Sequence, residues 1–321
     1  MTTGINTFDS RTYCQLRDQF VPVCDWLESL NINISPTRIG KYKRQVTKLA
    51  EATDTEALAK LKQEFPDEVF INLGYETSNW MHIHKGLRQS KTSSELTSLL
   101  IKAISAPEML IDDKKGQSGR DFAYELYAAA YLRAGDYKFD WTTTADIRAQ
   151  HDQIKLLAEC KRPRSEATLV RNLRDSFGQL RERYTLDRSA FGVTFIALDL
   201  FVTNELRDIG ATNLQEAADK VKIRMEMIVR SSFSLWQDKT RDKRTLGVIF
   251  TCNCPTTIGE QRLVTNIHWV HAVPLGPARN FYFEENDQFH KILTIVNAAN
   301  SLNSKIQHGK RWPSGLRNAQ M

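Results

Sequence analysis

Hydrophobic and polar residues alternate over two short stretches in the middle of the chain, and this pattern predicts a β-hairpin. Residues 154–161 form one arm, which ends before Pro163 because proline cannot donate to a sheet ladder. Residues 145–149 form the other arm, and the polar residues 150–153 between them are typical of a turn.

Alternation along the strand at 154–161 separates an apolar face from a charged one. The apolar face, suited to a core, holds Leu156, Ala158 and Cys160. Glu159 and Lys161 project together from the other face. A hairpin symmetric about residues 150–153 places Asp146 opposite Leu157 and makes Glu159 its diagonal neighbour, so that Asp146, Glu159 and Lys161 converge. A register shift of one residue would move Asp146 to the other face.

Helical periodicity surrounds the hairpin. Residues 119–134 predict a helix that ends at Gly135, with Glu125 in a stripe shared by Phe122, Ala129 and Leu132. A carboxylate in such a stripe faces the protein, where it needs a metal or a positive partner such as a nearby arginine. Residues 166–184 predict a second helix, and the apolar run at 191–201 predicts a central strand.

The remaining pattern predicts a mainly helical region up to about residue 107, a long helix at 214–236, and strands at 246–252 and 267–273. The expected fold class is therefore α/β, with a mixed central sheet flanked by helices and a helical N-terminal region. We expect three parts: residues 1–111 for substrate or partner binding, 112–300 as the catalytic domain, and 301–321 as a basic tail around Trp312.

Three carboxylates, Glu125, Asp146 and Glu159, can share one site only if something positive joins them. Mg²⁺ or Mn²⁺ fits, since hard cations take oxygen ligands. Such a cation can activate water and neutralise charge on a phosphate, and Lys161 beside it would orient the water or stabilise the transition state.

A helical Glu, then Asp-x12-Glu-x-Lys on a hairpin, then a helix, resembles the PD-(D/E)xK nuclease superfamily with its restriction-endonuclease-like core. The resemblance covers roughly residues 119–200. It implies that Asp146 and Glu159 bind the metal, that Lys161 is catalytic and that Glu125 completes the site. Ala145 stands where the family motif has proline. Some branches have a functional glutamine in the following helix, and Gln179 is the matching candidate.

Positive charge gathers just beyond the Glu-x-Lys motif, which predicts contacts with phosphates. The candidates for nucleic-acid binding are Arg162, Arg164, Arg171, Arg174, Gln179 and Arg181. The alternative is an exposed, solvated face. The net charge of +6 suits a nucleic-acid ligand without establishing one.

Cysteine and histidine pairs offer a weaker hypothesis of metal binding. Cys252, Cys254, His268 and His271 fit no strong zinc spacing, and their apolar neighbours favour core strands. His82 and His84 have no acidic or cysteine partner nearby in sequence, which favours ordinary surface or core histidines. Trp80, two residues before His82, is interpreted as a core residue, although it could stack on a base.

These features predict a Mg²⁺- or Mn²⁺-dependent nuclease, with DNA favoured over RNA, of the kind found in restriction, phage-defence or repair systems. The alternatives are a catalytically silent nucleic-acid-binding protein on the same fold, a protein-interaction subunit, and a different enzyme. No Walker loop, G-x-S-x-G or H-E-x-x-H motif supports the last of these. Cutting both strands would favour a homodimer, and an accessory protein is the other candidate partner. Five scattered cysteines and the lack of a long apolar run predict a cytoplasmic protein without a membrane partner.

Overall fold

The computed structural model describes residues 3–52, 55–64, 67–107, 119–141, 145–152, 154–200, 213–232, 242, 244–256 and 263–275. Its helices are α1 (Tyr13–Ser29), α2 (Arg38–Glu51), α3 (Thr55–Glu64), α4 (Asp67–Leu87), α5 (Ser94–Ile104), α6 (Gly119–Ala134), α7 (Glu166–Leu186) and α9 (Leu214–Ser231). Its strands are β1 (Thr3–Thr12), β2 (Lys138–Asp140), β3 (Ile147–His151), β4 (Ile154–Lys161), β5 (Ala190–Ala197), β6 (Thr245–Thr256) and β7 (Leu263–Pro274).

The strands form one seven-stranded mixed sheet in the order β1-β7-β6-β5-β4-β3-β2. The pairs β4–β5 and β5–β6 are parallel, and the other neighbours are antiparallel. Helix α7 connects the parallel strands β4 and β5, because a parallel pair needs a crossover rather than a tight turn. The predicted α/β class with a mixed sheet is confirmed.

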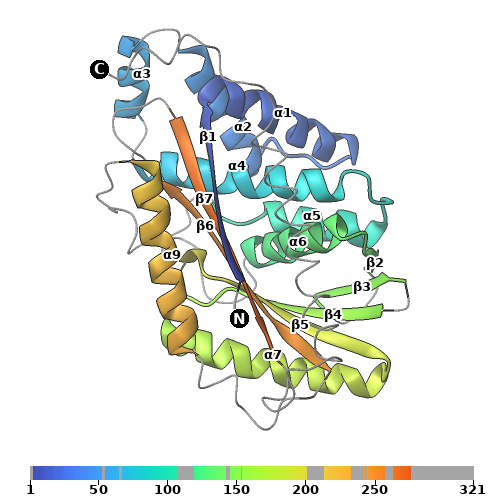
Figure 1. Cartoon of the computed structure of the whole chain (residues 1–321). Coiled ribbons are helices and arrows are strands. Elements are labelled where there is room, and N and C mark those ends of the chain that lie inside the picture. Colours follow the sequence, from blue (N-terminus) through green and yellow to red (C-terminus); the bar gives the residue numbers. More distant parts are fainter. Residues whose placement is uncertain are drawn as a thin grey trace.

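Helices cover both faces of the sheet, as Figure 1 shows: α1, α2, α4, α5 and α6 lie on one face, and α7 and α9 lie on the other. Each face has its own hydrophobic core. Alternate residues of β5 divide between them, with Val193 and Phe195 in the first core and Ile196 in the second. The site at the end of β4 therefore lies between two layers of helices.

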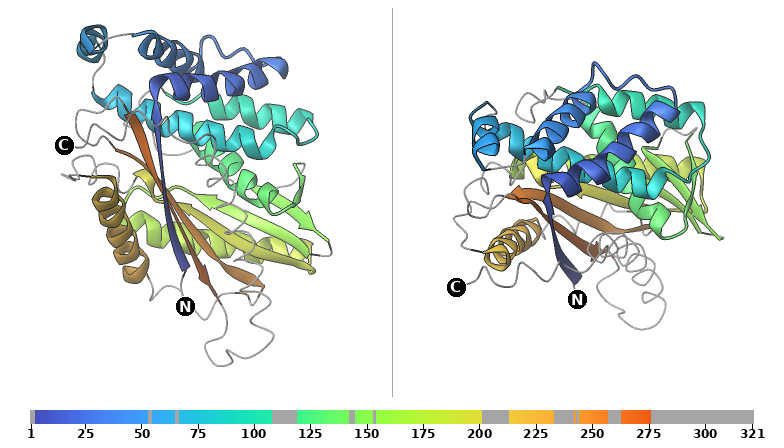
Figure 2. Two further views of the ribbon diagram at one scale, coloured as in Figure 1. Left: turned by 45° about the horizontal axis from the view of Figure 1, so that its top comes forward. Right: turned by 90° about the horizontal axis from the view of Figure 1, so that it is seen from above.

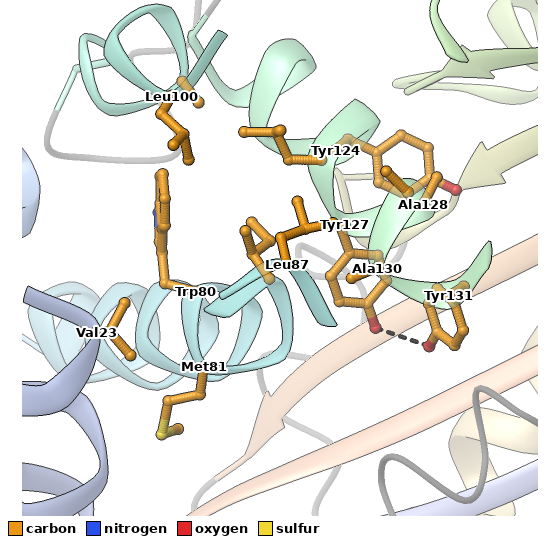
Figure 3. Packing of buried hydrophobic residues seen from close by; sticks show 14 of the residues in the cluster. Val23, Trp80, Met81, Leu87, Leu100, Tyr124, Tyr127, Ala128, Ala130 and Tyr131 are labelled. Carbon is orange, nitrogen blue, oxygen red and sulfur yellow. Dashed lines mark hydrogen bonds between the residues drawn. The ribbon is translucent and has the colours of Figure 1, made fainter. Parts of the chain in front are cut away.

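Helix α4 passes through the first layer and is buried along most of its length. Figure 3 shows Trp80 of this helix directed toward Leu100 of α5, and Tyr127 and Tyr131 of α6, whose hydroxyl groups are 2.9 Å apart. Trp80 is fully buried, so its predicted core position is confirmed. The sequence pattern missed this helix because it is buried on nearly every side and mixes apolar residues with buried polar ones such as Glu76 and Ser78, so that no amphipathic stripe marks it.

The N-terminal region is mainly helical, as expected, but it begins with a strand that the sequence pattern did not predict. Residues 3–12 form β1, which pairs antiparallel with β7 from Thr3↔Ala272 to Thr12↔Leu263. Figure 2 shows this strand beside β7, with the helices that follow it stacked over the sheet. The predicted tail at 301–321 and the boundary at residues 111 and 112 lie outside the described residues.

Candidate active site

Strand β4 presents Glu159 and Lys161 side by side, as the alternation predicted. Its apolar face, including Leu156 and Ala158, packs into the core with α6. Glu159 is fully buried on the opposite face, and its Oε2 accepts a hydrogen bond from Lys161 Nζ at 3.2 Å. Its other carboxylate oxygen pairs with the guanidinium of Arg183 on α7. Two cations therefore hold a carboxylate whose burial alone would be costly.

Asp146 directly precedes β3 and joins the two arms of the hairpin. Its Oδ2 accepts a hydrogen bond of 2.8 Å from the backbone N–H of Cys160 and lies 3.9 Å from Lys161 Nζ. The ammonium of Lys161 thus contacts the carboxylates of both Asp146 and Glu159. This contact is local, because all three residues belong to one hairpin.

The hairpin register differs from the predicted one by two residues. Ile147 pairs with Ala158 and Arg148 with Leu157, so Asp146 is not opposite Leu157. The strand continues to His151, and Asp152 makes the turn with a positive φ of 50°. A shift of two residues preserves the face of every side chain, which is why Asp146 still reaches Lys161.

Glu125 approaches from the other side of the sheet. It belongs to α6, which begins and ends where the sequence predicted, and its side chain is half-buried. Burial and, after it, the negative charges of Asp146 and Asp121 raise the pKa of Glu125 to about 8, against the opposing effect of Lys161 and Lys102. The repulsion shows that Glu125 and Asp146 are electrostatic neighbours.

An open cleft of about 510 Å³ leads to this pair. Glu125 and Asp146 line it together with residues of α5 and with Trp141. Lys102 of α5 lies over the ring of Phe122, with Nζ 5.3 Å from the ring centroid. Lys161 and Asp146 keep 20% and 22% of their side chains exposed, so small molecules can reach both.

The predicted convergence of three carboxylates on one point is not found. Within the part of the chain that the structure describes, no group of three or more His, Cys, Asp or Glu side chains is arranged to hold a metal. Glu125 and Glu159 lie on opposite sides of the sheet, and Asp146 at the end of the hairpin lies between them. The donors that are present still suit Mg²⁺ or Mn²⁺, since both are hard cations and Mg²⁺ commonly uses only one or two carboxylates.

The predicted nucleic-acid contacts separate into two groups. Arg164, Arg171, Arg174 and Arg181 are exposed, as a phosphate contact requires. Arg162 does not fit this role, because only 2% of its side chain is exposed and its Nη1 donates to Asp121 at 3.1 Å. Gln179 of α7 is half-buried, with a buried amide oxygen.

Arg183 is the site residue that the motif did not identify. It follows Gln179 by four residues on α7, so the two side chains lie on the same face of the helix. Burial lowers the pKa of Arg183, while the charge of Asp146 opposes this effect. The spacing to Gln179 was the available signal in the sequence, but only the packing of α7 on β4 shows that this face meets Glu159.

The cysteine and histidine pairs are parts of the core. Cys252 pairs with Trp269 and Asn253 with His268 across β6 and β7, so His268 lies on the face opposite to Cys252, Cys254 and His271. The zinc alternative therefore has no geometric support. In α4, His82 is buried between Tyr127 and Tyr131, with ring centroids 4.3 and 4.4 Å away.

No family model, no curated protein and no solved structure matches this chain. Among the described residues, no helix is both long and apolar enough to cross a membrane.

Proposed function

We propose that this protein is a metal-dependent nuclease with a restriction-endonuclease-like core, acting on DNA in preference to RNA. The arrangement of α6, the β3–β4 hairpin, α7 and β5 supports this proposal, because it presents an acidic pair and a lysine at one end of the sheet. The single observation on which it rests is the contact of one lysine ammonium with Asp146 and Glu159, beside an open cleft.

Each residue has a distinct part in the proposed reaction. Asp146 and Glu159 would hold Mg²⁺ or Mn²⁺ as two carboxylate donors, and Glu125 of α6, on the other side of the sheet, would support the cation through a bound water. When bound, the cation supplies an activated water and neutralises charge on the phosphate. Lys161, fixed by Glu159 at 3.2 Å, would donate to a phosphate oxygen or orient the attacking water.

The exposed arginines of α7 would hold the phosphates of the substrate on either side of the cut. Arg164, Arg171, Arg174 and Arg181 lie on or just before this helix. Such contacts position the substrate without reading its sequence, and their number determines how steeply binding falls with salt. Double-strand cleavage in this scheme requires a homodimer or an accessory protein, and we propose a cytoplasmic setting.

The test is cleavage of supercoiled plasmid, linear DNA, single-stranded DNA and RNA, with Mg²⁺, with Mn²⁺ and with EDTA. Glu159→Gln and Lys161→Met preserve side-chain size, and we expect each to slow metal-dependent cleavage by about 100-fold or more. Lys155→Met is the matched control, since Lys155 lies on the same face of β4 but pairs with Asp187 at 3.5 Å. Undiminished cleavage in both site variants would refute the site.

A catalytically silent nucleic-acid-binding protein is the second candidate. The specific observation in its favour is that protein cations, Lys161 and Arg183, already neutralise Glu159. Calorimetric titration with Mg²⁺ and Mn²⁺ separates the two candidates. A silent protein would bind DNA equally well in EDTA and would show no metal binding that Glu159→Gln or Asp146→Asn removes.

A further inference from the structure

A second cleft continues from the candidate site toward the end of α6. Its volume is about 490 Å³, and it shares Glu95, Asp140 and Trp141 with the first cleft. The connection between α4 and α5, the last turn of α6 and strand β2 form its walls. The two clefts therefore meet at Trp141, the residue directly after β2.

Two aromatic rings line the junction. Phe139 and Trp141 have ring centroids 5.0 Å apart with an interplanar angle of 43°. Both are only partly buried, although they rest against the main core. Large aromatic side chains are usually buried, and those that stay exposed in a cleft often mark a binding site. The pair therefore offers a π surface to a ligand.

Charge changes sign along the combined cleft. The end at the candidate site contains Glu125 and Asp146 beside Lys102, and the far end contains Lys91, Arg133 and Lys138. The carboxylates of Glu95 and Asp140 line both clefts, so acidic groups outnumber basic ones only at the first end. An acidic end suits a metal ion with a bound phosphate, and a basic end suits the next phosphate of the same chain. The aromatic pair lies between them, where a base of that chain would be.

We propose that this cleft binds a single-stranded or locally unpaired nucleic acid, with one base stacked on Trp141 and the adjoining phosphate held by Lys138 and Arg133. This inference rests on the proposed function for the acidic end of the cleft. It extends that function by specifying the substrate as an unstacked strand.

A duplex cannot use the surface in the same way. The faces of its bases are covered by neighbouring bases, so an aromatic side chain can stack only on a base that is exposed. Every base has a π face, and the strand is therefore bound with little preference for sequence. DNA and RNA share this chemistry, and the test compares both.

The test measures fluorescence anisotropy of labelled oligothymidine, oligouridine and a DNA duplex, in EDTA so that nothing is cleaved. Trp141→Leu removes the π surface but keeps an apolar side chain against the core, and Trp141→Phe keeps a smaller π surface. Trp26→Leu is the matched control, because Trp26 of α1 also packs partly buried against this core but is outside the cleft. Thermal unfolding of each variant checks that the fold is intact.

We expect Trp141→Leu to weaken single-strand binding by about 5- to 150-fold, the range reported for one base stacked on an aromatic side chain. Trp141→Phe should retain most of the affinity, and duplex binding should change by less than about twofold in both variants. Equal loss for duplex and single strand, no loss in Trp141→Leu, or no single-strand binding by the wild type would each overturn the inference. Loss of single-strand binding in Trp141→Leu, together with no metal-dependent cleavage by the wild type, would refute the proposed hydrolysis but leave the stacking surface in place.

Discussion

Two carboxylates in this site meet the cost of burial in different ways. Glu159 is fully buried and contacts the cationic groups of both Lys161 and Arg183. Glu125 is half-buried, and its burial together with the charges of Asp146 and Asp121 raises its pKa to about 8 even though Lys161 and Lys102 oppose the shift. With a pKa of about 8, Glu125 keeps its proton at neutral pH in the metal-free protein, while the two cations offset the burial of Glu159.

Replacing Glu125 with Gln should change how stability depends on pH. The pKa of Glu125 is about 8 in the folded protein and 4.5 in the unfolded chain, so the folded state binds the extra proton between these values. Stability of the wild type then falls as pH rises through this window, and the variant lacks that loss. We expect the free energy of unfolding of Glu125→Gln, relative to wild type, to rise by ~1–3 kcal/mol between about pH 5 and about pH 8.

Urea unfolding in EDTA at several pH values measures this difference. Glu95→Gln is the matched control from the same cleft, because backbone and serine hydrogen bonds lower the pKa of Glu95. Glu95 stays ionised throughout the window in both states, and its variant should run parallel to the wild type. A parallel curve for Glu125→Gln as well would contradict the raised pKa.

At the scale of elements, local sequence patterns correctly predicted those helices and strands whose structure depends on neighbouring residues. The bounds of α6 and β4 agree with the prediction, and the alternation of β4 placed Glu159 and Lys161 on the correct face. The register of the β3–β4 hairpin was wrong by two residues, because the turn at Asp152 is tighter than residues 150–153 indicated.

Long-range packing accounts for what the pattern missed. Strand β1 pairs with β7, some 260 residues later in the chain, and nothing local signals that partner. Helix α4 lacks an amphipathic period because other elements surround it. The role of Arg183 was missed for the same reason, because its contact with Glu159 forms only when α7 packs on β4. The direction from which Glu125 approaches likewise depends on which face of the sheet α6 covers.

Replacing Arg183 with Ala should destabilise the contact between α7 and β4. The substitution removes one of the two cations that contact the buried Glu159 and leaves the contact with Lys161, and we expect a loss of ~1–3 kcal/mol in the free energy of unfolding. Arg181→Ala, on an exposed position of the same helix, should change stability by less than ~0.5 kcal/mol. Combining Arg183→Ala with Glu159→Gln should restore much of the loss, because the unpaired charge is then absent. Additive losses in the double variant, measured by urea unfolding, would contradict the ion pair.

At the scale of the whole molecule, the helical N-terminal region and the sheet share one core. The first hydrophobic core includes Leu16 of α1 and Leu73 of α4 together with Ala158 and Phe195 of the sheet. A buried ionic cluster joins the same parts: Glu76 of α4 pairs with Arg38 of α2 at 3.2 Å and with Arg120 of α6 at 2.5 Å. Arg38 also donates to the carbonyl oxygen of Ala103 in α5 at 2.7 Å.

This cluster predicts that the helices and the sheet unfold together. Glu76→Gln would remove the buried carboxylate charge that pairs with two buried guanidiniums, and we expect it to lower the free energy of unfolding by ~3–5 kcal/mol. Asp25→Asn, which removes a surface pair with Lys43 at 3.5 Å, should cost less than ~1 kcal/mol. Scanning calorimetry should show one transition in the wild type, and Glu76→Gln should move that whole transition to lower temperature. Two transitions, with Glu76→Gln shifting only one of them, would instead establish residues 1–111 as a separate folding unit. A single shifted transition would mean that substitutions in the N-terminal helices also destabilise the packing of α6, and with it the position of Glu125.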